Sequence, residues 1–214
     1  MTPERMKKYF QNRTVGLYGT VGEYAVLVPL VEREDGLCLL FETRAETLVG
    51  HQPGEVCFPG GRVEPGEEPR DAALRETWEE LGIPMEAVEI LAPLDLIQDI
   101  SDRLIYPFLA VVEPSAAAHL RPNPAEVKDA FFVPLDFLLD YPEEVYRYPV
   151  QVQGKEDFPF QRMGFPRDYP WRGGWIDVPV YEFQGHAIWG IIGRLVRWLL
   201  GHLRAMKETG EAPT

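Results

Sequence analysis

Residues 61–83 read Gly-Arg-Val-Glu-Pro-Gly-Glu-Glu-Pro-Arg-Asp-Ala-Ala-Leu-Arg-Glu-Thr-Trp-Glu-Glu-Leu-Gly-Ile. Glycine, glutamate and arginine residues in this stretch fit the pattern G-x5-E-x7-R-E-x-x-E-E-x-G. They are Gly61, Glu67, Arg75, Glu76, Glu79, Glu80 and Gly82. Because each residue type makes up several per cent of an average sequence, such a match arises by chance on the order of once in 10⁸ starting points. The pattern therefore carries information about both the fold and the chemistry of the chain.

The second half of the stretch predicts a helix from Pro69 to Leu81. Proline is tolerated in the first helical turn, where the N–H that it lacks would have no partner. Gly82 suits the position just after the last turn, and Pro84 prevents the helix from continuing. The spacing therefore predicts a helix that begins and ends within the pattern itself.

Three glutamates share one face of this helix, because successive residues are about 100° apart: Glu76, Glu79 and Glu80. Leu74, Trp78 and Leu81 lie on the opposite face, which is predicted to pack on a sheet. Ala72 and Ala73 extend the carboxylate face with little bulk. They would leave room for a ligand beside the carboxylates.

Two interpretations of the carboxylate face compete. It is either a solvated acidic surface or a site for a hard divalent cation, which would relieve the repulsion between like charges at i,i+4. A solvated face requires neither the Gly60-Gly61 turn nor Glu67 and Arg75, so the cation site is favoured. Oxygen ligands without sulfur or paired histidine select Mg²⁺ or Mn²⁺ over Zn²⁺.

Arg75 and Gly61 are assigned supporting roles around this face. Arg75 points off its side and is predicted to hold Glu67 or Glu79 in place rather than to bind a substrate. The turn Phe58-Pro59-Gly60-Gly61 lets the backbone approach a cation closely. The carbonyl oxygen of Gly61 is therefore a further candidate ligand.

Composition excludes several classes of function. The chain has 214 residues and a formal net charge of −13, which argues against a nucleic-acid partner. The apolar stretch 187–203 is interrupted by Arg194, Arg197 and His202, which indicates an amphipathic helix rather than a membrane span. The two cysteines, Cys38 and Cys57, lie in apolar runs and are predicted to be packed thiols, so a reducing cytoplasm is expected.

Strand-like and helical segments alternate along the chain. Strands are predicted at 23–32, 36–42, 55–58, 88–97, 104–112, 131–133 and 178–183, and helices at 69–81, 135–140 and 187–208. The fold class is therefore α/β or α+β, with a mixed sheet between helices. We predict one domain over 1–214, with an N-terminal extension at 1–20. Residues 143–176 are rich in proline, glycine and aromatics and are interpreted as an insertion or lid.

The pattern at 61–82 resembles the signature of the Nudix hydrolases, and the resemblance implies an α/β/α sandwich. Flanking motifs resemble the coenzyme A diphosphatase branch of that family. They are Leu39-Leu-Phe-Glu-Thr-Arg44, Gly54-Glu-Val-Cys-Phe-Pro-Gly-Gly61, Arg121-Pro-Asn-Pro-Ala-Glu-Val127 and Tyr181-Glu-Phe-Gln-Gly-His-Ala-Ile-Trp-Gly190. The branch usually carries a second arginine a few residues after Arg44, where this chain has Val49 or Gly50.

The resemblance implies a role for each matching residue. Glu76, Glu79, Glu80 and the Gly61 carbonyl would bind Mg²⁺ or Mn²⁺, while Arg75 and Glu67 complete the catalytic motif. The base that takes a proton from water would be Glu79 or Glu126, and for Glu126 a capping role is an equal alternative.

Two more residues are candidates for substrate binding. Arg44 would bind a phosphate of the substrate, or would form a surface ion pair instead. Phe58 would stack near the substrate, or would belong to the core.

The expected substrate is coenzyme A or acyl-coenzyme A, cleaved to 3′-phosphoadenosine 5′-phosphate and 4′-phosphopantetheine. The change at Val49 and Gly50 keeps other diphosphates open, namely ADP-ribose, a dinucleotide or a nucleoside triphosphate. A ligand sensor without catalysis is less favoured, because the chain keeps all the carboxylates of the pattern. The expected partner is thus a small nucleoside diphosphate derivative, and a homodimer is kept open.

Overall fold

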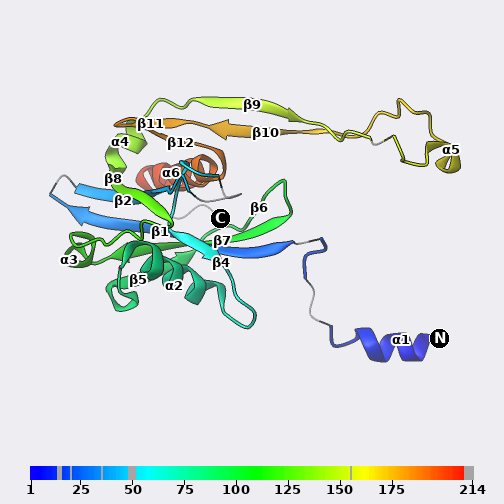
Figure 1. Ribbon diagram of the computed structural model, residues 1–214, viewed down its shortest axis with the longest axis horizontal. Helices are drawn as coiled ribbons and strands as arrows, with labels where there is room; N and C mark the ends of the chain where they lie inside the picture. Colours follow the sequence, from blue (N-terminus) through cyan, green and yellow to red (C-terminus); the bar gives the residue numbers. More distant parts are fainter. Residues whose placement is uncertain (14–15, 20, 35, 48–51, 155, 210–214) are drawn as a thin grey trace.

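A mixed β-sheet forms the centre of the molecule in the computed structural model, which describes residues 1–13, 16–19, 21–34, 36–47, 52–154 and 156–209 (Figure 1). Strand β1 pairs in parallel with β7, and the other pairings in this sheet are antiparallel. The central order is β3-β2-β1-β7-β5, with β4 beside β1, β6 beside β7 and β8 beside β2. The strands are β1 (Gly22–Arg33), β2 (Gly36–Arg44), β3 (Val56–Cys57), β4 (Gly60–Arg62), β5 (Val88–Pro93), β6 (Ile97–Gln98), β7 (Arg103–Val112) and β8 (Val127–Pro134).

Two long helices cover opposite faces of this sheet (Figure 1). Side chains alternate along β1, so that Ala25 and Leu27 pack with α2 (Pro69–Leu81), whereas Val28 and Leu30 pack in the cluster that contains α6 (Gly190–Thr209). Three short helices connect or follow strands of this sheet, namely η1 (Met85–Ala87), α3 (Pro114–Ala117) and α4 (Leu135–Asp140). The predicted α/β/α sandwich with a mixed sheet is therefore confirmed.

Helix α2 has the predicted bounds, but its buried face differs from the prediction. It ends at Gly82, whose φ of 70° is left-handed. Leu74 and Leu81 are buried as expected, whereas Trp78 is 53% exposed. Ala73 and Thr77 face the sheet instead, because small side chains let the helix approach it closely. The expectation that Ala72 and Ala73 leave room for a ligand is wrong, since both are fully buried.

Residues 143–176, which the sequence analysis interprets as an insertion or lid, contain most of a long hairpin. Strands β9 (Val145–Val150) and β10 (Gly174–Pro179) pair antiparallel, and the short helix α5 (Phe160–Met163) lies at the far end of the hairpin (Figure 1). A second hairpin, β11 (Tyr181–Phe183) and β12 (His186–Ile188), takes up the start of the segment predicted as the last helix.

The N-terminal segment carries helix α1 (Pro3–Phe10), which has no buried residue and lies away from the sheet (Figure 1). Among the described helices, α6 included, none is both long and apolar enough to cross a membrane.

The hairpin between β6 and β7 depends on Asp99, which gives a first prediction. Its side chain, 3% exposed, accepts hydrogen bonds from the N–H groups of Ser101 and Arg103 and from Arg103 Nε. Burial raises the pKa of Asp99, but these bonds outweigh it and leave the pKa below its usual value. The charged form therefore stabilises the fold above the unfolded-state pKa of about 4, and this stability is lost as the pH falls through the lower folded-state pKa.

We expect Asp99→Asn to lower the free energy of unfolding by about 1–3 kcal/mol at pH 7, with a smaller loss below pH 4. Urea unfolding at both pH values measures this difference. Asp102→Asn is the matched control, because Asp102 lies in the same hairpin and its side chain is bonded only to exposed Gln98 among the described residues. A loss of equal size for both variants would contradict the assignment.

Candidate active site

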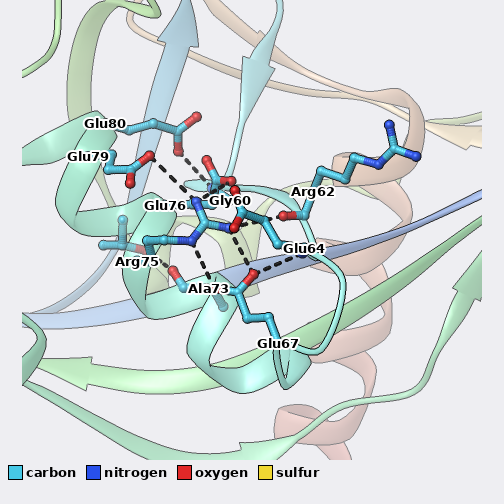
Figure 2. A network of polar contacts seen from close by, with 10 residues as sticks. Gly60, Arg62, Glu64, Glu67, Ala73, Arg75, Glu76, Glu79 and Glu80 are labelled. Atoms are coloured by element: carbon cyan, nitrogen blue, oxygen red, sulfur yellow. Dashed lines mark hydrogen bonds and ion pairs between the residues drawn. The ribbon is translucent and has the colours of Figure 1, made fainter.

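The guanidinium group of Arg75 is the centre of a polar network at one edge of α2 (Figure 2). Nε and Nη2 donate to the two carboxylate oxygens of Glu67 at 2.8 and 3.0 Å. Nη1 donates to Glu76 Oε1 at 2.8 Å and lies 3.5 Å from Glu79 Oε2, while Nη2 also donates to the carbonyl oxygen of Arg62 at 3.1 Å. These contacts agree with the positioning role predicted for Arg75.

Glu67 connects this network to the loop that precedes α2. Its Oε2 also accepts the backbone N–H of Glu64 at 2.9 Å. The Arg75 guanidinium, together with this N–H, holds the pKa of Glu67 below its usual value. Glu67 therefore stays charged and fixes the orientation of Arg75 from the side opposite Glu76 and Glu79 (Figure 2).

Glu80 is the buried carboxylate of the helix, with 4% of the residue exposed. Its Oε2 accepts the N–H of Gly60 at 2.8 Å, which links α2 to the start of β4. Burial, with help from the charges of Glu42 and Glu76, raises the pKa of Glu80 to about 9. The uncompensated charge at Glu80 is thus costly, and a cation beside it would stabilise the ionised form.

Glu42 on β2 belongs to the same cluster, and the sequence analysis missed it. The residue is 1% exposed, and its Oε1 accepts the thiol of Cys57 at 3.3 Å. Burial raises the pKa of Glu42 to about 7, against the Cys57 hydrogen bond and the charge of Arg44. The sequence contained a signal for this buried carboxylate. Every second residue of a strand lies on the same face, so Glu42 shares a face with Leu40 and Arg44 in a strand that is mostly buried.

Glu126 lies next to this cluster, in the turn before β8. Its carbonyl oxygen accepts the N–H of Ala45 at 2.8 Å, which fixes the turn against the end of β2. Burial raises the pKa of Glu76 first of all, and the charges of Glu79 and Glu126 add to the effect. Asn123 Oδ1 accepts the Ala125 N–H at 3.2 Å, so Asn123 supplies a side-chain cap in this turn.

Of the two residues predicted to bind substrate, Arg44 lies beside the carboxylate cluster and Phe58 lies in the core. Arg44 is half-buried, and its Nη1 lies 3.9 Å from Cys57 Sγ, so it faces the carboxylate cluster rather than a surface ion pair. Phe58 is 1% exposed and stacks on Phe41 with ring centroids 4.6 Å apart. The structure thus supports the core alternative for Phe58. The change at Val49 and Gly50 lies outside the described residues.

The donor groups of this site fit a hard divalent cation. A Cβ at Gly61 would lie 2.3 Å from Glu76 Cδ, so only glycine lets the backbone lie against that carboxylate. Burial raises the pKa of the Cys57 thiol well above its usual value, so the thiol stays protonated and oxygen atoms are the ones that would bind a cation. Within the described part of the chain, no three acidic, His or Cys side chains already surround one point. Glu76 is instead bonded to Arg75, and Glu80 to Gly60.

A cavity of about 880 Å³ lies on the α6 side of the sheet, between α6, β10 and residues 95–98. Arg147 and Arg197 line it, but both are paired with Asp177, at 3.2 and 3.7 Å. Arg197 also bonds Glu143 at 2.5 Å. These ion pairs account for the charges of Arg147 and Arg197. Arg194 also lines the cavity, but the described residues that line it include no glutamate of the sequence pattern, so the carboxylate cluster is the stronger candidate site.

Comparison with known proteins identifies the family. Residues 23–151 match the NUDIX domain. The chain belongs to the Nudix family. It is 38% identical over 135 residues to mouse peroxisomal coenzyme A diphosphatase NUDT7, a match that spans 63% of this chain and 56% of the mouse protein. It is 30% identical over 197 residues to human mitochondrial coenzyme A diphosphatase NUDT8, which spans 92% of this chain and 75% of the human protein.

A bacterial Nudix relative extends the comparison. The uncharacterised Nudix hydrolase NudL of Photorhabdus laumondii is 32% identical over 176 residues, which is 82% of this chain and 81% of that protein. The Nudix assignment and the resemblance to coenzyme A diphosphatases are therefore confirmed. The mouse and human relatives are named peroxisomal and mitochondrial, so a cytoplasmic location of this chain stays a prediction.

The contact between Gly61 and Glu76 gives a prediction for this Nudix site. Gly61→Ala should displace the Glu76 carboxylate, which is the flexible end of a side chain, so stability should change by less than about 1 kcal/mol. Diphosphate hydrolysis should fall about 10- to 100-fold, because a carboxylate of the candidate site is moved. Gly60→Ala is the informative contrast, since its Cβ would lie 2.3 Å from the backbone oxygen of Ala25 and should unfold the site. An active Gly61→Ala enzyme would contradict this geometry.

Proposed function

We propose that this Nudix hydrolase cleaves the diphosphate of coenzyme A or acyl-coenzyme A. The products would be 3′-phosphoadenosine 5′-phosphate and 4′-phosphopantetheine or its acyl form. The names of the mouse and human relatives support the substrate. The observation that carries the chemistry is the cluster of α2 carboxylates against Gly60 and Gly61, where buried negative charge has too few partners.

Glu76, Glu79, Glu80 and the Gly61 carbonyl are proposed to hold Mg²⁺ or Mn²⁺. When bound, the cation would neutralise charge on the diphosphate as the P–O bond breaks. Arg75 bonds both Glu67 and the ligand Glu76, and its two bonds to Glu67 do not depend on Glu76. Glu67 therefore keeps the guanidinium in place when Glu76 turns to the cation.

The remaining steps are assigned to three side chains. A water oxygen forms a bond to one phosphorus, the bridging P–O bond breaks, and a carboxylate takes the proton of the water. Glu79 suits this role because its side chain is 44% exposed, the most accessible of the three helix carboxylates. Glu126 is the other candidate base, on the β8 side of the cluster. Arg44 is proposed to bind a phosphate from the same side.

The same chemistry on another diphosphate is the second candidate function. One observation favours it, namely that the second arginine of the coenzyme A branch is replaced at Val49 or Gly50. ADP-ribose, a dinucleotide or a nucleoside triphosphate would then be the substrate. Both candidates use the same cation site, so they differ only in what binds around the diphosphate.

A substrate panel separates these candidates. The protein is incubated with Mg²⁺ or Mn²⁺ and equal amounts of coenzyme A, an acyl-coenzyme A, ADP-ribose, NADH and diadenosine polyphosphate, and the products are separated. We expect preferential release of 3′-phosphoadenosine 5′-phosphate, full loss of activity in a chelator, and recovery when the cation is returned. Preference for another diphosphate would overturn the substrate, and hydrolysis that resists the chelator would overturn the cation mechanism.

Glu79→Gln tests the assignment of the catalytic carboxylates. It removes a negative ligand or base from an accessible position, so kcat should fall about 10²- to 10⁴-fold while the fold is kept. Glu68→Gln is the matched control, since Glu68 is exposed at the start of the same helix and its side chain makes no capping hydrogen bond. Steady-state kinetics with coenzyme A measure both. A Glu79→Gln enzyme with near-full kcat would refute the assignment.

A further inference from the structure

The buried carboxylate of Glu42 has one oxygen that the protein leaves without a partner. Oε1 accepts the Cys57 thiol at 3.3 Å. Among the described residues, no donor lies within hydrogen-bonding distance of Oε2, and that atom is shielded from bulk water. A buried carboxylate oxygen without a partner costs stability, and an apolar side chain of the same shape would avoid that cost.

The strands around Glu42 fix where this oxygen lies. Glu42 pairs with Cys57 of β3 on one side and with Ala130 of β8 on the other. The thiol therefore holds Oε1 on the β3 side. Strand β4, which follows β3, begins at Gly60, whose N–H donates to Glu80.

Three other carboxylates lie near enough for their charges to interact with that of Glu42. Glu80 comes from α2 and Glu126 from the turn before β8, whose backbone is bonded to the end of β2. Glu76 is the third acidic group close enough to act on Glu42. Among the described groups whose charges act most strongly on the Glu42 carboxylate, Arg44 is the cationic one, so Glu42 and the three other carboxylates exceed it by three negative charges.

We propose that Glu42 is a further ligand of the divalent cation, with Oε2 as its donor atom. This inference rests on the cation site proposed above and adds a ligand from the sheet to those of α2. The cation would thereby bridge the helix and strand β2. Cys57 acts as a positioning residue, because its thiol holds the other oxygen of Glu42 and leaves Oε2 for the cation.

Mn²⁺ binding tests this inference without any substrate. Free Mn²⁺ is measured by electron paramagnetic resonance during titration of the full chain and of Glu42→Gln, which keeps the size of the side chain. We expect the Kd for Mn²⁺ to rise by about 10- to 100-fold in the variant. Without cation, the variant should melt at the same temperature as the parent or higher, because a buried charge has been removed.

Glu55→Gln is the matched control for the loss of one negative charge. Glu55 lies next to β3, and its carboxylate is acted on by Arg44 but is not part of the proposed cation site. The Kd of the Glu55→Gln variant for Mn²⁺ should stay within about threefold of the parent value, because solvent screens a charge that lies at a distance from the cation. An equal loss of Mn²⁺ affinity in both variants would mean that Glu42 acts only through its net charge and not as a ligand. That result would overturn the inference.

Two further outcomes separate this inference from the proposed function. Parent-like Mn²⁺ affinity in Glu42→Gln, with a lower melting temperature, would make Glu42 a structural residue and leave the proposed function standing. Absence of Mn²⁺ binding by the parent chain would overturn both. If the amide prevents folding, Glu42→Met replaces it, because methionine fills a similar volume without a buried polar group, and the same loss of affinity is expected.

Discussion

The bonds between Arg75 and the carboxylates around it are the interaction on which the site depends. Four glutamates and several strand ends meet where α2 crosses the sheet, and their mutual repulsion would otherwise push the helix away. The guanidinium bonds Glu67 through two parallel hydrogen bonds and still reaches Glu76 and the Arg62 carbonyl. A lysine could not make these contacts at once, because it lacks the planar fork of donors.

The second constraint is that helix α2 must lie close to the sheet. Helix α2 lies near β1 because Ala73 and Thr77 are small and fully buried. This approach brings Glu80 within hydrogen-bonding distance of the Gly60 N–H and brings Glu76 against Gly61. The proposed cation site therefore depends on the packing of α2 against the sheet on one side and on glycine on the other, and its carboxylates are only partly neutralised by the protein.

The sequence predicted those parts of the fold that local physics controls. The bounds of α2 and α4 follow from proline, glycine and hydrophobic spacing, and the mixed sheet follows from apolar runs. Contacts between segments that are distant in the sequence were harder to predict. The helical spacing of Trp78 predicted that its side chain is buried, yet Ala73 and Thr77 are buried against the sheet and Trp78 is exposed. The hairpin of β9 and β10 pairs residues across a stretch of aromatics and prolines that has no regular period.

The site shows the same division. The motif placed the α2 carboxylates and Arg75, but Glu42 joins them only through the pairing of β2 with β3 and β8. The most direct test of the account is anomalous diffraction at the manganese edge from crystals of the full chain soaked in Mn²⁺. The account predicts an anomalous peak within ligand distance of Glu76, Glu80 and the Gly61 carbonyl oxygen. A peak elsewhere, or Arg75 still bound to Glu76 with no peak beside it, would contradict it.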